Sequence, residues 1–312
     1  MKSIRIGTRG SKLALWQAGW VESELKRHWP ALEVQIVVLK TEGDRRLDVN
    51  LSIVGGKALF IKEIEDSLLN KKIDVAVHSL KDLPVDLPPG LIVAAVPERA
   101  DPADVLLSPQ KVSFKKLPAG TKVGTSSIRR RCQLKRLRSD LVYEDIRGNV
   151  DTRIRKMIDG KVGALVLAKA ALDRLSLSSL ITDTLPILPA VGQGALALEV
   201  LRDDESTLNF LKPLNDPTSF LCASAERAFL KVMGGNCQVP LACYAHPVNA
   251  VGPDEQKIEL TAFVSDLEGK NHLQEIQQVS IADTLKTAEK MAHSLLKKGG
   301  KQILDEILKV HF

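Results

Sequence analysis

Short apolar runs alternate with amphipathic segments through the first two thirds of the chain. Residues 3–8 alternate apolar and polar positions as a strand does, and residues 11–29 place apolar side chains at helical spacing until Pro30. A strand, a helix and two further strands are expected next, at 34–40, 57–70, 73–79 and 91–96. Alternating β and α segments predict a parallel or mixed sheet covered by helices.

A second block of the same kind follows the polar, proline-bearing stretch at 97–104, which is typical of a connection between domains. Its strands and helices are expected in alternation at 121–126, 127–138, 141–148, 150–158, 163–168 and 168–175. After residues 188–194, the apolar run at 195–200 can return to the first sheet as a strand. That return would give the two blocks two connections and a hinge.

The pattern changes near residue 217. A helix is expected there, then three strands and two amphipathic helices, near 242–248, 257–266, 273–281 and 282–309. Strands grouped before helices predict a small α+β domain after the two α/β domains. The expected boundaries are 1–98 for domain 1, 99–194 for domain 2, 195–214 for the return segment of domain 1 and 215–312 for the C-terminal domain.

Composition places the chain among globular proteins. The 312 residues are 44% hydrophobic and 26% charged, and this length exceeds what one core usually supports. The N-terminal stretch lacks the apolar region of a signal peptide, and no apolar run approaches the roughly 18 residues that span a bilayer. We therefore expect a cytoplasmic protein that does not associate with membranes.

The cysteines follow no common zinc or redox spacing. Cys132 and Cys222 fall within or near helical patterns and are expected to be small packed side chains. Cys237, Cys243 and His246 match no common metal site and lack a fourth ligand, so no metal is expected.

A net charge of +6 indicates an anionic partner, and the basic residues concentrate in GTSSIRRRCQLKRLR at 124–138. Thr125 and Ser127 stand where a strand ends and a helix begins, where hydroxyls and unpaired N–H groups favour an anion. A solvated basic helix face is the alternative interpretation. Nucleic acid is another, but aromatic residues are 4% of the chain and none lies within this segment to stack on bases. Small carboxylate ligands fit better.

A second candidate segment is VAVHSLKDLP at 75–84, in which an apolar strand leads into Ser79, Lys81 and Asp82. Ligands of open α/β sheets bind beyond strand ends, so these residues are candidates, although Asp82 could equally be a turn residue. His78 is expected to be a structural donor rather than a base. Arg9 follows the first strand in a similar position.

Two glycine-bearing segments add candidates. Lys57 follows a glycine pair, which suggests a lid, whereas Phe60 could be a core residue. In GGNCQVPL at 234–241, Cys237 follows two glycines and an asparagine. A thiol on such a turn is accessible, and nearby cations would favour the reactive thiolate, while a buried structural cysteine is the alternative.

Eight motifs together resemble the porphobilinogen deaminase family, also called hydroxymethylbilane synthases. In the family's order they are TRGSKLALWQ, GGKALFIKE, AVHSLKDLP, GTSSIRRRCQL, IRGNVDTR, LPAVGQGA, AERAFL and CQVP. The resemblance implies two domains like those of periplasmic binding proteins with a hinged cleft, and a third domain that carries the cofactor. It also implies that four porphobilinogen molecules are condensed with loss of ammonia, and that hydrolysis then releases hydroxymethylbilane.

The resemblance assigns roles residue by residue. Cys237 would hold a dipyrromethane cofactor, assembled from two substrate molecules, through a thioether. Asp82 would be the catalytic carboxylate, because its charge stabilises the cationic pyrrole left when ammonia departs. Cofactor binding is implied for Ser79, Lys81, Thr125, Ser127, Arg129, Arg130 and Arg147. Substrate binding is implied for Arg9, Arg147, Arg153 and Arg174, and a lid for Lys57 and Phe60.

One departure and two alternatives remain open. Many family members place an acidic residue, a glycine and a small residue before this cysteine, whereas Gly234, Gly235 and Asn236 precede it here, which leaves the loop conformation unspecified. A non-catalytic two-lobed binding protein for a small anion would share the arginines, but would need no Cys237. A nucleic-acid-binding protein is the third class. The family implies a monomer.

Overall fold

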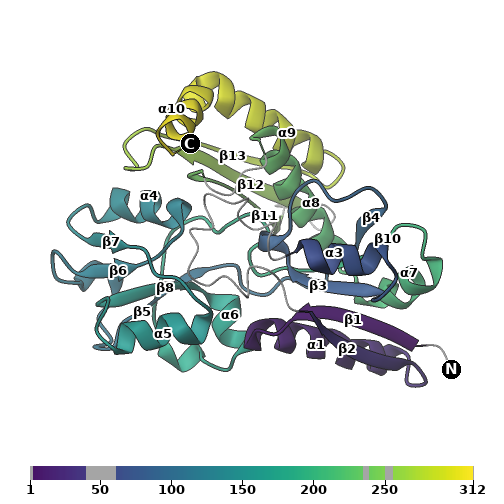
Figure 1. Ribbon diagram of the computed structural model, residues 1–312. Coiled ribbons are helices and arrows are strands. Elements are labelled where there is room, and N and C mark those ends of the chain that lie inside the picture. The colour runs from purple at the N-terminus through teal and green to yellow at the C-terminus, as the bar shows by residue number, and fades with distance from the viewer. Residues whose placement is uncertain (1–2, 40–60, 235–238, 250–255, 312) are drawn as a thin grey trace. The chain divides into compact units, whose positions relative to one another are not determined.

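The computed structural model describes residues 3–39, 61–234, 239–249 and 256–311. The chain folds into two compact units, Met1–Ala100 with Gly194–Phe220 and Asp101–Gln193 with Leu221–Phe312. Figure 1 labels the sheets and helices of each unit. Within these described ranges, no helix is long and apolar enough to cross a bilayer.

The first unit is built around a five-stranded mixed sheet. Its strands are β1 (Ser3–Arg9), β2 (Glu33–Leu39), β3 (Val75–Ser79), β4 (Leu91–Ala95) and β10 (Leu196–Leu201). Their spatial order is β2-β1-β3-β10-β4, in which β1 runs parallel to β2 and β3 and β10 runs antiparallel to β3 and β4. The run predicted at 195–200 therefore does return to the first sheet.

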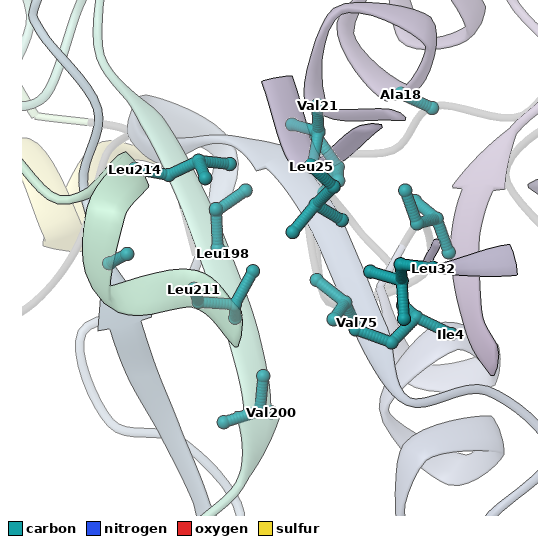
Figure 2. Close-up of a cluster of buried hydrophobic side chains, with 13 residues drawn as sticks. Ile4, Ala18, Val21, Leu25, Leu32, Val75, Leu198, Val200, Leu211 and Leu214 are labelled. Carbon is teal, nitrogen blue, oxygen red and sulfur yellow. The ribbon is translucent and has the colours of Figure 1, made fainter. Parts of the chain in front are cut away.

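One face of this sheet packs against α1 (Lys12–His28). The helix begins after Ser11, whose hydroxyl accepts a hydrogen bond from the backbone N–H of Ala14 and so caps the first turn. Figure 2 shows side chains of α1 pointing toward Ile4 of β1 and Val75 of β3, with Leu198 of β10 in the same buried cluster. Leu211, at the end of α7 (Glu205–Leu211), closes the cluster.

The other face packs against α3 (Lys62–Leu69). Successive strand residues point to opposite faces, so Ala76 lies on this side while Val75 and Val77 lie on the α1 side. Ile64 and Leu68 of α3 bury themselves around Ala76.

The second unit contains a sheet of the same pattern. Its strands are β5 (Asp104–Leu107), β6 (Lys122–Gly124), β7 (Val142–Glu144), β8 (Ala164–Ala168) and β9 (Ile181–Thr184). Their order is β7-β6-β8-β5-β9, in which β6 runs parallel to β7 and β8 and β5 runs antiparallel to β8 and β9. In each sheet, the antiparallel inner strand is the one reached by a connection from the other unit.

Helices cover both faces of this sheet. Leu134 of α4 (Ile128–Leu137) packs against Val123 and Val166 on one face. Ile154 of α5 (Val150–Ile158) packs against Leu165 on the other face, and α6 (Lys169–Arg174) follows β8 directly.

The remainder of the second unit is a three-stranded antiparallel sheet with helices. The strands are β11 (Leu241–Asn249), β12 (Gln256–Ser265) and β13 (His272–Ser280). The helices are α8 (Pro217–Val232), which belongs to this unit from Leu221 onward, α9 (Thr284–Leu295) and α10 (Lys301–His311). Phe263 of β12 is buried with Cys132 of α4. Short turns of 3₁₀ or π type complete the chain: η2 (Leu80–Asp82), η3 (Phe114–Lys116), η4 (Ser178–Leu180), η5 (Lys212–Leu214) and η6 (Leu296–Gly300).

The structure confirms most predicted elements and adds others. Strands β5 and β9 and helix α7 were not predicted, and β5 begins at Asp104, the last residue of the expected linker. The helical stretch at 282–309 is broken at Gly299, whose φ of 114° lies in the left-handed region. The helix predicted at 57–70 is seen from Lys62, because residues 57–60 lie outside the described ranges.

Candidate functional site

The first unit gathers its predicted site residues at one edge of its sheet. Arg9 is the last residue of β1 and Ser79 is the last residue of β3. These strands run parallel, with Gly7 opposite Ala76, so both carboxyl ends reach the same edge. Lys81 and Asp82 follow directly in η2, where Lys81 is half-buried and Asp82 is exposed.

Local hydrogen bonds fix the turn that carries Lys81 and Asp82. The side-chain amide of Gln17 donates to the Ser79 hydroxyl over 2.8 Å. The backbone N–H of Leu80 donates to the carbonyl of Ala195 over 3.0 Å. The turn ends at Leu83, whose ψ of 130° is the extended backbone expected before a proline.

The second unit places its predicted site residues in the same relation to its own sheet. β6, β7 and β8 run parallel and end at Gly124, Glu144 and Ala168. The segments that leave these carboxyl ends carry the candidates: Thr125, Ser127, Arg147, Arg153 and Arg174. Each unit therefore has one polar edge at the position where open α/β sheets bind ligands.

The hydroxyl groups after β6 shape the start of α4. Ser127 Oγ accepts from the Arg130 N–H over 3.4 Å and caps the helix, and Thr125 Oγ1 accepts from the Ser127 N–H over 3.3 Å. Ser126 Oγ donates to the Ile146 carbonyl over 2.8 Å, which ties this turn to the loop after β7. The sequence-based expectation of hydroxyls at a helix start is confirmed.

Arg129 and Arg130 converge on Asp104, and these three residues with Gln193 form what we term the arginine cluster. Nη2 of Arg129 lies 2.7 Å from Asp104 Oδ2, and Nη2 of Arg130 lies 2.7 Å from Asp104 Oδ1. The Gln193 amide donates to Asp104 Oδ1 over 2.8 Å. Arg129 also donates to the Leu188 carbonyl, and Arg130 donates to the Val166 carbonyl over 3.0 Å.

Charge in the arginine cluster is unbalanced. Burial disfavours the charged carboxylate of Asp104, but the guanidinium groups of Arg129 and Arg130 and the Gln193 hydrogen bond outweigh burial and hold the pKa of Asp104 well below its ordinary 3.8. Within the described residues, Asp104 is the only carboxylate paired with either arginine, and each arginine is 6% exposed. Nε of Arg129 is buried without a hydrogen-bond partner. One positive charge is thus in surplus, which favours an anionic ligand.

The remaining arginines lie in the segments that follow β7 and β8, with Arg174 at the end of α6. Nε of Arg153 donates to the Gly148 carbonyl over 2.6 Å, and Nζ of Lys156 donates to the Arg147 carbonyl over 3.0 Å. These bonds hold the loop after β7, on which the Arg147 side chain is exposed. Burial lowers the pKa of Arg174 to about 10, against the opposing charge of Asp173, so an added carboxylate would stabilise this guanidinium.

The thiols divide into two groups. Cys132, Cys222 and Cys243 are buried and form no disulfide, which confirms the packed positions expected for Cys132 and Cys222. Burial raises the pKa of Cys132 to about 12, so its thiol is unreactive. The predictions for Cys237, Lys57 and Phe60 fall outside the described residues. Among the residues that are described, no group of three His, Cys, Asp or Glu side chains could hold a metal ion.

Sequence reasoning missed two buried polar clusters. Asp104 was read as part of a linker, and nothing local identifies Arg130 as its partner 26 positions later. Glu199 and Glu65 were also missed, although Glu199 pairs with His78 over 2.9 Å. A charged residue within the apolar run ALALEV was the available signal for that cluster.

Comparison with known proteins covers nearly the whole chain. Residues 4–209 match the family model described as "Porphobilinogen deaminase, dipyromethane cofactor binding domain". Residues 220–299 match "Porphobilinogen deaminase, C-terminal domain". Among solved structures, the methionine binding protein MetQ has a TM-score of 0.44 and 13% identity, covering 75% of this chain and 96% of that one. Likeness at that level says nothing of ligand or activity.

Curated relatives named porphobilinogen deaminase match along nearly their full length. The protein of Syntrophomonas wolfei is 46% identical over 99% of this chain and 100% of its own. That of Geobacter sulfurreducens is 44% identical over 98% of this chain and 95% of its own. With two family models in succession and relatives of this identity and coverage, the chain belongs to the porphobilinogen deaminase family.

Proposed function

We propose that this protein is a hydroxymethylbilane synthase. It condenses four porphobilinogen molecules head to tail on a dipyrromethane cofactor bound to Cys237. Each addition releases one ammonia, and a final hydrolysis consumes one water and releases hydroxymethylbilane. The observation that carries the proposal is the surplus positive charge of the arginine cluster, within the segment that matches the dipyrromethane-binding family model.

The residues of the second unit fit a dipyrromethane. Its acetate and propionate groups are carboxylates, and guanidinium groups bind carboxylates through paired N–H donors. Arg129 offers a buried, unpartnered Nε, and Arg147, Arg153 and Arg174 lie in the segments that follow β7 and β8. When bound, the cofactor supplies the free pyrrole carbon that attacks the activated substrate.

Asp82 is assigned the catalytic role in the first unit. When porphobilinogen loses ammonia, it becomes an electron-poor methylene pyrrole with cationic character, and a carboxylate stabilises that charge. The same oxygens accept hydrogen bonds from pyrrole N–H groups while protons move. Lys81 and Arg9, at the same edge, bind substrate or cofactor carboxylates, and Ser79 contributes a hydroxyl there.

Cys237 is assigned as the covalent anchor. The chain has four cysteines, and the three that the structure describes are buried. A thioether to a pyrrole needs a thiol that the substrate can reach, which leaves the cysteine of the CQVP motif. Lys57 and Phe60 are assigned to a lid on the glycine pair that precedes Lys57 and on the family resemblance.

The organisation proposed with this function has three domains. Residues 1–98 and 195–214 form the first, 99–194 the second and 215–312 the third. The protein is proposed to act as a monomer, as the family resemblance implies. It is proposed to act in the cytoplasm, without a nucleic-acid or membrane partner.

The test is turnover by the purified protein. Porphobilinogen should be consumed with one ammonia released per molecule and one hydroxymethylbilane formed per four. A non-catalytic binding protein would retain porphobilinogen without releasing ammonia, and that result would overturn the proposal. Salt-dependent DNA binding in the absence of turnover would favour the nucleic-acid class instead.

A further inference from the structure

Three ionisable side chains meet inside the first unit, on the α3 face of its sheet. Glu199 of β10 is the register partner of Ala76, and His78 is the partner of Ala197. Because alternate residues share a face, His78 and Glu199 lie on the same side as Ala76, where α3 packs and carries Glu65.

The geometry of this group is that of a buried ion-pair cluster. His78 Nε2 lies 2.9 Å from Glu199 Oε2, and their side chains are 5% and 0% exposed. Oε1 of Glu199 and Oε1 of Glu65 are both buried without a hydrogen-bond partner. The Glu199 carboxylate is paired with the imidazole, and Glu65 on α3 is 9% exposed with one oxygen buried. A second buried negative charge in this group would be costly.

A proton on Glu65 removes that cost. Burial raises the pKa of Glu65 to about 7, the charge of Glu199 and the weaker one of Asp66 act in the same direction, and His78 opposes them. The other strands that pack on α3 contribute little: β4 has no ionisable side chain, and on β1 Arg5 is paired with Asp74 while Arg9 lies at the strand end.

The cluster lies directly before the turn that carries Asp82. His78 directly precedes Ser79. The backbone N–H of Leu80 donates to the carbonyl of Ala195, which lies two residues before Ala197, the strand partner of His78. The imidazole thus lies two residues before the start of this turn, and it is paired with Glu199.

We propose that Glu65, His78 and Glu199 form a positioning cluster for the turn that carries Lys81 and Asp82. Glu199 holds the imidazole in place, and Glu65 stores one proton so that the cluster has a single negative charge to balance. The inference rests on the proposed function, since it concerns the placement of the Asp82 carboxylate. Ionisation of Glu65 would add a second negative charge beside His78 and disturb the turn.

The test compares holoenzyme variants by kcat and KM for porphobilinogen between about pH 6 and about pH 9, with thermal unfolding measured in parallel. E199Q should lower kcat roughly tenfold or more while KM changes less than about threefold, and E199D should recover part of the loss. E65Q should shift the alkaline limb of the kcat profile to higher pH, because an amide cannot ionise. D66N, an exposed change on the same helix, should leave kcat unchanged.

Four results would overturn the inference. If E199Q lowers the unfolding temperature while kcat per holoenzyme stays that of the wild type, the cluster is purely structural. If E65Q leaves the alkaline limb of the kcat profile unmoved, Glu65 does not store the proton. If D66N moves that limb as far as E65Q does, Glu65 is not the source of the shift. If E199Q does not fold, H78Q takes its place, and wild-type kcat in H78Q contradicts the inference. The two proposals fail separately: absence of turnover by the wild-type holoenzyme overturns the proposed function, and an active D82N overturns the role of Asp82. An inactive D82N beside a fully active E199Q overturns only the positioning cluster.

Discussion

Asp104 organises the charge buried in the second unit. It neutralises one of the two guanidinium groups that touch it, and both of those groups are almost fully buried. Removing one partner of a buried ion pair leaves an uncompensated charge, which costs more than the pair itself contributes.

D104N should therefore destabilise the protein by about 3 to 5 kcal/mol, measured as a fall in the free energy of unfolding. D140N is the matched control, because Asp140 pairs with Arg138 at the surface with 43% of its side chain exposed. Its effect should be much smaller, because solvent screens an exposed pair. Equal effects of the two variants would contradict the cluster's role.

Acid should destabilise the folded protein by protonating Asp104. The pKa of Asp104 is lowered in the folded state, so the folded state releases this proton more readily than the unfolded chain does. Its contribution to stability is fully present above the ordinary pKa of 3.8 and is lost as the pH falls below it. In urea titrations across that range, D104N should lose less stability than the wild type. A parallel loss in both proteins would contradict this assignment.

D82N should abolish turnover without unfolding the protein. Asp82 is exposed, so the amide costs little packing, but a neutral group cannot stabilise the cationic pyrrole. We expect kcat for ammonia release to fall on the order of 10²- to 10³-fold, with an unchanged unfolding temperature. D86N, an exposed change in the same loop, should retain kcat, and near-normal ammonia release by D82N would remove Asp82 from its role.

Among the elements, the turn between β12 and β13 is held against α4 by close backbone contact. Gly269 has a φ of 75°, and a Cβ there would lie 2.3 Å from the Cys132 carbonyl oxygen. Lys135 of α4 also pairs with Glu268 in this turn over 2.5 Å. The absence of a side chain at residue 269 is thus what permits the contact.

G269A should destabilise the second unit by well over the 1 to 2 kcal/mol that a left-handed alanine costs by itself, roughly 3 kcal/mol or more. G120A is the matched control, since Gly120 has a φ of 77° and nothing within 4 Å of an added Cβ. Chemical denaturation of both variants measures the difference. Equal losses would show that backbone strain alone matters at residue 269.

Predictability from sequence also differs between elements. Strands such as β3 and β8 and helices such as α1 were predicted because their hydrophobic periods are strong and local. β5 and β9 have four residues each and acquire their identity only by pairing with each other and β8. The site candidates at strand ends were visible as motifs. The Asp104 and Glu199 pairings were not, since their partners are 26 and 121 residues away.

At the scale of the molecule, the two units repeat one design. Each has three parallel strands and an antiparallel strand that enters from the other unit. Predicted site residues stand at the carboxyl ends of β1 and β3 in the first unit and follow those of β6, β7 and β8 in the second. The first edge carries the carboxylate of Asp82, and the second carries the surplus charge of the arginine cluster. The proposed reaction passes through a cationic intermediate, which a carboxylate stabilises. Its product gains carboxylates with each addition, and guanidinium groups bind them, so the reaction needs both kinds of edge.

The intact mass of the protein, purified from cells that make tetrapyrroles, tests the central claim most directly. The account predicts a mass above that of the polypeptide by two porphobilinogen units less two molecules of ammonia. In C237A, both this added mass and bilane formation should be lost. An unmodified wild-type mass, or a C237A variant that forms bilane at the wild-type rate, would contradict the covalent anchor on which the account depends.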